Sequence, residues 1–457
     1  MTYQIPERLV EKYAVIGPRY TSYPTAPMWH DIDQEQQRKW LLQNQEAKRP
    51  VSLYLHIPFC RERCFYCGCN VHLTKQQKTS AVYVKYLLKE LDHLADFHKG
   101  NRNIRQLHFG GGTPNFLLNE EFQQIIEKIK TNFHFETDAE IGIEMDPCTT
   151  RPGQLEFLRQ LGVNRLSLGV QDFDEKVQIA VNRIQGKDIT LQHLELARSL
   201  GIQGINFDLI YGLPHQSVES FNETLKSVIE MRPDRLAVYN FGYLPHRMPH
   251  QRKIDPQALP NEKVKLEILF QTIDSLTAAG YNYIGMDHFA LPEDELSSAL
   301  KSRTLYRNFM GYTPKSGVDL IGVGMTAISE FGRYFVQNQK TLKSYQDSID
   351  RYGLAGCRGI ELTTDDLIRK WTILRLICHF YLSFDEFQSE FKVDFIEYYK
   401  EEMAQLKDLE NDGILKITDE SVTVVDFGKI LVRNICMVFD AYLKKQEVPK
   451  VKYSKTI

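Results

Sequence analysis

Short apolar runs alternate along the chain with longer segments in which apolar residues recur every three or four positions. The short runs predict strands at residues 51–57, 104–109, 140–145, 165–170, 205–210 and 236–241. The segments between them predict helices at residues 81–98, 120–132, 154–161, 190–200 and 219–230. Strands that alternate with helices form a parallel sheet with right-handed crossovers, so the pattern predicts an α/β barrel or an open doubly wound sheet.

Unusual residues follow these predicted strands directly. A cysteine-rich loop comes after the first strand, the glycine-rich segment 110–114 after the second, and Glu144 lies at the end of the third. Gln171 follows the fourth strand, and Asp208 lies within the fifth. Because chemistry in α/β folds collects at the carboxyl ends of the strands, we expect these groups to meet at one mouth.

The pattern changes after about residue 355, where helical periodicity predominates. The predicted elements are an N-cap at residues 363–366, helices at 367–380 and 395–409, a hairpin of 414–417 and 422–425, and a last helix that runs to residue 443. Helices combined with a β wing indicate a small winged-helix-like domain at the C-terminal end.

Composition and charge exclude several classes of function. The chain has 457 residues with 42% hydrophobic and 25% charged content, which is typical of a globular protein rather than a disordered one. Its formal net charge of −3 provides no basic field to recruit nucleic acid or anionic lipid. No run approaches the ~18 apolar residues of a membrane span, and the start lacks a signal-peptide pattern, so we expect a soluble cytoplasmic protein.

Four of the eight cysteines crowd into ten residues, in a C-x3-C-x2-C-x-C arrangement. Thiolates of Cys60, Cys64 and Cys67 on so tight a loop can hold three corners of a cubane iron-sulfur cluster, which leaves the fourth iron open to a chelating ligand unless Cys69 bends back. Zinc is the main alternative, but a single knuckle without a second ligand pair fits it poorly, and a disulfide fits less well still. The scattered cysteines are expected to be ordinary small apolar residues; they are Cys148, Cys357, Cys378 and Cys436.

Residues near the cysteines carry a functional and a structural interpretation side by side. The aromatic Phe65 and Tyr66 could shield a cluster from water or simply pack in the core. The segment 110–114 lets backbone approach a ligand closely, although by itself it could be only a tight turn, and it is not a P-loop. His56 and His108 alternate with apolar residues, so we interpret them as satisfied core histidines rather than metal ligands.

Four polar residues downstream could orient a ligand that combines a nucleoside with an amino acid. Glu144, Gln171, Arg183 and Asp208 could bind its ribose hydroxyl, amino and carboxylate groups through charge-assisted hydrogen bonds. Taken singly, each could equally be a surface or structural residue.

The cysteine loop and the glycine-rich strand after it resemble the radical S-adenosylmethionine (SAM) superfamily. Within it the chain is similar to the family of oxygen-independent coproporphyrinogen III oxidases. The matching segments are Arg19 to Thr25, His56 to Cys60, Cys69, Gly110 to Pro114, Gly169 to Phe173, Asp208 to Pro214, Gly285 to Ala290, Arg307 to Phe309 and Arg433 to Cys436.

The resemblance covers nearly the whole chain and implies a fold and an activity. It implies an N-terminal arm at residues 1–48, a partial radical SAM (β/α) barrel with extensions at 49–354, and a mainly helical C-terminal domain at 355–457. It implies the conversion of coproporphyrinogen III to protoporphyrinogen IX in haem biosynthesis. In that reaction a reduced 4Fe-4S cluster cleaves SAM, and the resulting 5'-deoxyadenosyl radical takes a hydrogen from a propionate β-carbon before carbon dioxide and one electron leave.

The resemblance also implies residue roles. The cluster ligands would be Cys60, Cys64 and Cys67. Contacts to the iron-bound SAM map onto Tyr54, Gly111, Glu144 and Ile328. Contacts to a second SAM map onto Tyr66, Gly112, Thr113, Gln171, Arg183, Asp208 and Gly242. The family has phenylalanine and alanine where this chain has Tyr66 and Gly242.

The last expectations concern the substrate, the partners and the alternative functions. A substrate with four propionates requires local cations, for which Arg19, Arg247, Arg252 and Arg307 are candidates. We expect a monomer that receives electrons from a low-potential donor such as flavodoxin or ferredoxin, with an electron acceptor that the sequence does not identify. Related haem chaperones and haem-cleaving radical methyltransferases are alternatives; the chaperones generally lack the arm and the fourth cysteine that this chain has.

Overall fold

The structure is a computed structural model that describes residues 5–98, 103–444, 455 and 456. Contacts divide the chain into two compact units. The first, here called the barrel unit, consists of His30–Lys265 and Gly317–Glu361. The second, called the helical unit, combines the chain up to Trp29, Leu266–Ser316 and the chain from Leu362 onward. The three segments expected at 1–48, 49–354 and 355–457 stay a prediction, because the compact units do not follow chain order.

A run of parallel strands forms the centre of the barrel unit. Neighbours pair in the order β14 (Asp319–Val323), β2 (Val51–Ile57), β5 (Asn103–Gly111), β6 (His134–Met145), β7 (Arg165–Gln171), β8 (Ile205–Tyr211) and β9 (Arg235–Asn240). All six strands predicted from the sequence are present, and the predicted α/β class is confirmed. The pairing of β14 with β2 was not predicted.

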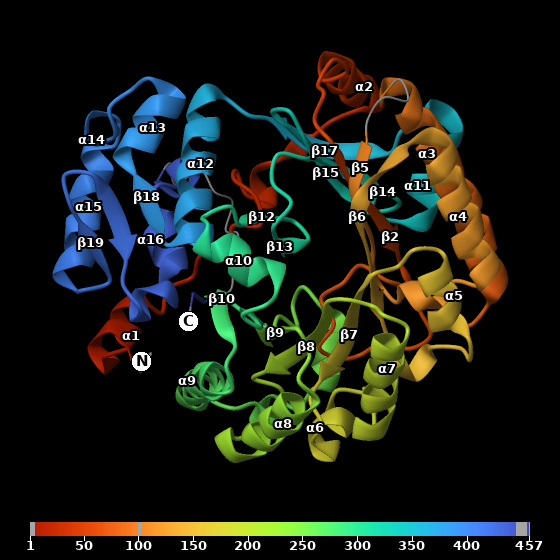
Figure 1. The fold of residues 1–457 in the computed structure, drawn as a ribbon, viewed down its shortest axis with the longest axis horizontal. Helices are drawn as coiled ribbons and strands as arrows, with labels where there is room; N and C mark the ends of the chain where they lie inside the picture. The colour runs from red at the N-terminus through yellow and green to blue at the C-terminus, as the bar shows by residue number, and fades with distance from the viewer. Residues whose placement is uncertain (1–4, 99–102, 445–454, 457) are drawn as a thin grey trace. The chain divides into compact units, whose positions relative to one another are not determined.

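Helices connect these strands and lie outside them. They are α3 (Gln77–His98), α4 (Asn119–Asn132), α5 (Gln154–Gln160), α6 (Glu175–Ala180), α7 (Lys187–Ser199) and α8 (Val218–Met231). Figure 1 shows α3, α4, α5, α7 and α8 following one another along the outside of the strands. In α8 the buried residues Phe221, Leu225 and Val228 lie on one face, and Ser217 caps the first turn. Coverage on one side is the arrangement of a barrel wall, so the partial barrel is confirmed over the doubly wound sheet.

The sheet continues past β14 in antiparallel strands. Their order is β15 (Ile328–Phe331), β16 (Tyr334–Asn338), β17 (Gly356–Glu361) and β1 (His30–Asp31). The helices α2 (Gln34–Gln43) and α11 (Leu342–Tyr352) accompany this extension. These strands were not predicted from the sequence.

The helical unit contains the predicted C-terminal elements. Its elements are α1 (Glu7–Tyr13), most of α9 (Glu262–Ala278), β10 (Asn282–Gly285), β11 (His288–Ala290), α10 (Glu295–Lys301), β12 (Tyr306–Asn308), β13 (Gly311–Thr313), α12 (Thr364–His379), β18 (Tyr381–Ser383), α13 (Phe384–Phe391), α14 (Phe395–Tyr398), α15 (Lys400–Asn411), β19 (Leu415–Ile417), β20 (Ser421–Val424), α16 (Val432–Val438) and α17 (Ala441–Lys444). Thr363 caps α12 as predicted, and β19 and β20 form the predicted hairpin, to which β18 adds a third strand.

One helix predicted in the helical unit is divided into two in the structure. Residues 395–409 form two helices, α14 and α15, that are separated at Tyr399. The Tyr399 ring is fully buried against Phe395 and Phe439, and its backbone leaves helical geometry with a ψ of 32°. The amphipathic pattern continues through the break, so periodicity alone could not reveal it.

The N-terminal segment packs within the helical unit. Arg19 forms an ion pair with Asp287, and the Tyr20 hydroxyl donates to the Asp440 carboxylate at 3.0 Å. Among the described residues, no helix combines the length and the hydrophobicity that crossing a bilayer requires.

Candidate active site

The cysteine loop begins where β2 ends, as the sequence predicted. After Pro58, the short strand β3 (Phe59–Cys60) pairs in parallel with β4 (His72–Leu73), so the two ends of the loop lie side by side. Backbone hydrogen bonds close this base: His72 N–H donates to the Pro58 carbonyl at 2.7 Å, and Thr74 N–H donates to the Cys60 carbonyl at 3.0 Å. The chain between them therefore forms a closed loop at the carboxyl end of the sheet.

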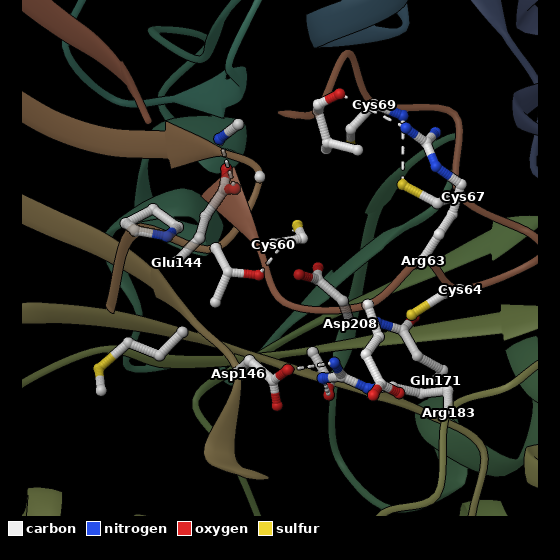
Figure 2. A pocket seen from close by; sticks show the side chains of 18 of the residues that line it. Cys60, Arg63, Cys64, Cys67, Cys69, Glu144, Asp146, Gln171, Arg183 and Asp208 are labelled. Carbon is white, nitrogen blue, oxygen red and sulfur yellow. Dashed lines mark hydrogen bonds and ion pairs between the residues drawn. The ribbon is translucent and has the colours of Figure 1, made fainter. Parts of the chain in front are cut away.

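The thiols of this loop share one pocket. Figure 2 shows Cys60, Cys64 and Cys67 around the same part of a pocket that Cys69 also lines. Within the described part of the chain, no three His, Cys, Asp or Glu side chains gather closely enough to bind one metal ion. Each thiolate of a cubane binds a different iron, whereas a zinc ion needs its ligands around a single point. Three loop thiols that line one pocket are a suitable set of ligands for three irons of a cubane.

The pocket shifts the pKa values of its cysteine thiols in different directions. Burial raises the pKa of Cys60 to about 11, and burial also raises the pKa of Cys64. Hydrogen bonding from Cys69 lowers the pKa of Cys67 to about 6, and the Cys69 N–H lies 3.4 Å from the Cys67 sulfur. Because metal ligands must be thiolates, binding of irons at Cys60 and Cys64 would release protons.

Close packing explains the run of glycines after β5. A Cβ on Gly110 would lie 2.8 Å from the Glu144 Oε1, and Gly111 has a φ of +114° that favours glycine. A Cβ on Gly112 would lie 2.7 Å from the backbone carbonyl carbon of Pro58. The N–H groups of Gly111 and Gly112 already donate to Glu144 Oε2 and to the Ile57 carbonyl. The run therefore seats β5 against the base of the cysteine loop.

Glu144 points from β6 into the pocket and is held by its neighbours. His108 Nε2 lies 3.2 Å from Glu144 Oε1, and the Tyr54 ring stacks on His108 with an interplanar angle of 13°. Burial alone would raise the pKa of Glu144, but the hydrogen bonds from His108 and Gly111 outweigh it and lower the pKa. Glu144 is therefore an anion at neutral pH, suited to an ammonium or hydroxyl ligand.

The two histidines are satisfied as predicted. His56 Nδ1 lies 3.1 Å from the Tyr54 hydroxyl, and His56 Nε2 lies 3.2 Å from the Asn70 carbonyl of the cysteine loop. The orienting role of His108 toward Glu144 was not predicted.

Strands β7 and β8 complete the pocket wall. At the end of β7 the register shifts, and Gln171 takes a left-handed φ of 68°. Arg183 forms an ion pair with Asp146 at 2.5 Å and donates to the Gly169 carbonyl at 3.0 Å. The buried Arg183 Nε has no hydrogen-bond partner among the described residues, which leaves a donor available to a polar ligand.

Asp208 is the partly buried carboxyl group of β8. It accepts hydrogen bonds from Ser167 Oγ and Asn206 Nδ2, each at 2.9 Å. Burial and the nearby charge of Glu144 raise the pKa of Asp208 to about 6. The pocket therefore contains two carboxyl groups whose pKa values are shifted in opposite directions.

This shift predicts a pH dependence of stability. Because the folded state holds the Asp208 proton more tightly than the unfolded state does, its contribution to stability is present below pH 3.8 and is lost as pH rises to about 6. Asp208→Asn should remove this loss and raise the unfolding free energy at pH 7 by up to about 3 kcal/mol. Urea unfolding of the cluster-free wild type and of Asp208→Asn between pH 4 and pH 7.5 measures this difference. Curves of unfolding free energy against pH that run parallel for the two proteins would contradict the prediction.

The structure brings most of the predicted site residues together. The predicted residues that line the pocket are Cys60, Cys64, Tyr66, Cys67, Gly111, Gly112, Thr113, Glu144, Gln171, Arg183 and Asp208. Three others do not line it. Tyr54 stacks beneath Glu144 on His108, Gly242 follows β9 on an exposed turn, and Ile328 begins β15.

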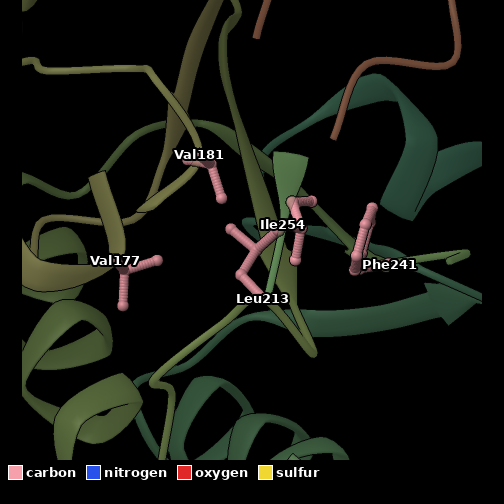
Figure 3. Close-up of a cluster of buried hydrophobic side chains, with 5 residues drawn as sticks. All are labelled: Val177, Val181, Leu213, Phe241 and Ile254. Carbon is pink, nitrogen blue, oxygen red and sulfur yellow. The ribbon is translucent and has the colours of Figure 1, made fainter. Parts of the chain in front are cut away.

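Phe65 and Tyr66 serve mainly as packing residues. They rest on a buried cluster, shown in Figure 3, that we call the loop support. Its members are Val177, Val181, Leu213, Phe241 and Ile254. Tyr66 also lines the pocket, and its role in shielding a cluster from water stays a prediction.

Several pocket residues were missed although the sequence carried a signal for them. In β7 and β8 the exposure alternates with a period of two, and the less buried face carries Ser167, Gly169, Asn206 and Asp208. Reading both predicted strands at this period would have placed Ser167 and Asn206 beside Asp208. Asp146 had no such signal, because its role depends on the ion pair with Arg183.

Comparisons with known proteins agree with this geometry. Residues 54–228 match the radical SAM superfamily. The chain is 46% identical over 438 residues to the oxygen-independent coproporphyrinogen III oxidase of Salmonella typhimurium, with 96% of this chain and 95% of that protein covered. It is 44% identical to the Pseudomonas aeruginosa oxidase, with 95% of each chain covered.

A solved structure supports the same relationship. Coproporphyrinogen III oxidase from Escherichia coli, described as a radical SAM enzyme, matches with a TM-score of 0.92 and 42% identity, covering 97% of this chain and 100% of that one. The resemblance inferred from the motifs is confirmed, and with it the 4Fe-4S cluster and SAM that the superfamily implies. The chain belongs to the family of oxygen-independent coproporphyrinogen III oxidases within the radical SAM superfamily.

Proposed function

We propose that this chain converts coproporphyrinogen III to protoporphyrinogen IX without oxygen, a step of haem biosynthesis. The observation that carries the proposal is the 46% identity to a curated oxidase over 96% of the chain, which extends well beyond the superfamily domain at residues 54–228. The pocket with three loop thiols is the place where the chemistry would begin.

The chain's own residues would hold and orient the reacting groups. Cys60, Cys64 and Cys67 would bind the cluster, which with SAM supplies the radical that removes a hydrogen atom from the substrate. Glu144, kept anionic by His108, would bind the amino group of SAM.

We propose that two SAM molecules bind. Residues assigned to the first, Gly111 and Glu144, lie in the same pocket as those assigned to the second, among them Gln171, Arg183 and Asp208. The unpartnered Arg183 Nε and the ribose-compatible carboxyl group of Asp208 support a second polar ligand. The contacts of Tyr54, Gly242 and Ile328 with SAM stay predictions.

The remaining partners follow from the reaction. The cluster must be reduced before each turnover, so the proposal includes a low-potential donor such as flavodoxin or ferredoxin, and an acceptor must take the electron that the substrate loses. We propose that the protein works as a monomer in the cytoplasm. Size-exclusion chromatography coupled to light scattering would measure the oligomeric state.

An anaerobic assay tests the proposed function. Reconstituted protein, reductant, SAM and coproporphyrinogen III are incubated together, and tetrapyrroles and 5'-deoxyadenosine are measured by mass spectrometry. Protoporphyrinogen IX formed together with 5'-deoxyadenosine is the expected result. An intact cluster with no decarboxylated product and tight haem binding would replace the oxidase with a haem chaperone, and methyl transfer with ring opening would indicate a methyltransferase.

Among the four candidate arginines, we propose Arg307 as the residue that anchors the substrate. It is only 5% exposed, its guanidinium lies 4.9 Å from the Tyr312 ring centre, and its Nε and one terminal nitrogen have no hydrogen-bond partner among the described residues. A buried cation without hydrogen-bonding partners is costly unless a ligand anion completes it. We infer that Arg307 binds a propionate carboxylate.

Replacing Arg307 with methionine should separate binding from stability. Without substrate, Arg307→Met should raise the unfolding free energy by about 1 to 2 kcal/mol because it removes a buried charge. The same variant should raise the KM for coproporphyrinogen at least about tenfold because an ion pair to the carboxylate is lost. Chemical unfolding and anaerobic kinetics measure the two effects, and a destabilised variant with an unchanged KM would contradict the inference.

A further inference from the structure

The chain after β9 returns to the cysteine loop. This segment runs from Phe241 to Ile254 and contains the short 3-10 helix η4 (Pro249–Lys253). Phe241 and Ile254, at its two ends, are both buried in the loop support (Figure 3). Phe65 and Tyr66 of the cysteine loop pack on the same cluster. The segment and the cysteine loop therefore share one apolar base.

His250 bonds directly to the backbone of a predicted cluster ligand. Its Nε2 lies 2.7 Å from the carbonyl oxygen of Cys67. A carbonyl oxygen can only accept, so Nε2 must carry the proton and donate. The partners lie 183 residues apart in the sequence.

Gln251 makes a second connection one residue further on. It is 2% exposed, and its Nε2 donates to the Gly242 carbonyl at 3.1 Å and to the Tyr66 carbonyl at 3.4 Å. Its Oε1 accepts from Leu244 N–H at 2.5 Å. One buried amide thus joins the turn after β9 to the cysteine loop, and its loss would leave several backbone groups without partners.

A third side chain of η4 and a residue from another element act on the same loop. The Lys253 ammonium lies 5.0 Å from the centre of the Phe65 ring, although an exposed contact of this kind is weak. On the other side, Asn182 donates to the Arg63 carbonyl at 3.0 Å, and Phe65 N–H donates to the Val181 carbonyl at 2.9 Å. The carbonyls of Arg63, Tyr66 and Cys67 and the N–H of Phe65 are therefore all bonded to residues outside the loop.

We propose that His250 and Gln251 form a latch that positions the cysteine loop for its cluster. The proposal rests on the proposed function only for the identity of the cluster. The loop between β3 and β4 contains no helix or strand of its own, and its one internal backbone hydrogen bond runs from Cys67 N–H to the Cys64 carbonyl at 3.2 Å, so the external hydrogen bonds supply much of its support. His250 and Gln251 are positioning residues, because they act through the backbone at Tyr66 and Cys67.

The first test needs no cluster. Hydrogen–deuterium exchange of the full chain is compared for wild type, Gln251→Leu, His250→Ala and the conservative His250→Gln. Amides of residues 61–71 should exchange about tenfold faster in Gln251→Leu and severalfold faster in His250→Ala, while His250→Gln should restore slower exchange because its amide can donate. The matched control is His246→Ala, an exposed histidine on the same segment.

The second test loads the cluster. The rate of iron release to a chelator under anaerobic conditions should rise about tenfold in Gln251→Leu, and the electron paramagnetic resonance signal of the reduced cluster with SAM should broaden. Exchange and release rates in both latch variants equal to those of His246→Ala would overturn the proposal. If the wild type acquires no cluster, the proposed function fails instead, and the exchange experiment still decides whether the latch exists. If Gln251→Leu does not fold, the comparison of His250→Ala with His250→Gln decides alone whether the latch exists, because His250 is only partly buried.

Discussion

Replacing any one of Cys60, Cys64 and Cys67 with alanine is expected to abolish formation of 5'-deoxyadenosine from SAM. The three thiols line one pocket, and a cubane that loses one protein ligand keeps only two. Changes to residues that merely support metal ligands cost 10- to 100-fold, so loss of a ligand should cost more than about 100-fold. Iron and sulfide content, the visible absorption of the cluster and 5'-deoxyadenosine yield measure the effect.

Substitutions of two other cysteines are the controls for this prediction. Cys148→Ala should retain cluster and activity, because Cys148 is an exposed thiol that does not line the pocket. Cys69→Ser should retain the cluster, because Cys69 donates to the Cys67 sulfur and a serine hydroxyl can do the same. A cluster that is lost in Cys69→Ser but retained in Cys64→Ala would show that the ligand assignment is wrong.

Gly112→Ala is expected to destabilise the protein by about 3 kcal/mol and to impair cluster assembly. The new methyl group would lie 2.7 Å from the Pro58 carbonyl carbon, 2.9 Å from its oxygen and 3.0 Å from the Ile57 oxygen. All three are backbone atoms at the base of the cysteine loop, so the clash can be relieved only by moving β5 or the loop. Chemical unfolding and cluster content after reconstitution measure the two effects.

Gly242→Ala is the matched control. An added Cβ there meets nothing within 4 Å, and the φ of Gly242 does not lie in the left-handed region. The substitution should therefore change stability by no more than about 1 kcal/mol, in the stabilising direction, because it restricts the unfolded chain. Equal destabilisation by the two substitutions would refute the steric explanation.

Much of the fold was predictable because its signals are local. Periodicity within segments of 6 to 18 residues correctly located six of the parallel strands and five of the connecting helices, but neither β14 nor α6. The pairing of β14 with β2 was not predictable in this way, because residues 319–323 and 51–57 have no local signal that names a partner. The break at Tyr399 was missed for a related reason: the amphipathic pattern of the segment is unbroken, and the tertiary burial of one ring interrupts the helix.

The sequence by itself determined the chemistry at the carboxyl ends of the strands. The spacing of Cys60, Cys64 and Cys67 places three thiols on one loop, and strand order brings Glu144 and Asp208 to the same edge, because parallel strands share their carboxyl ends. Only the tertiary structure decided how these groups are tuned. The bond from His108 to Glu144, the ion pair of Arg183 with Asp146 and the latch of His250 on Cys67 join residues that are 36, 37 and 183 positions apart. Such contacts depend on packing of the whole barrel unit, which no local pattern of residues encodes.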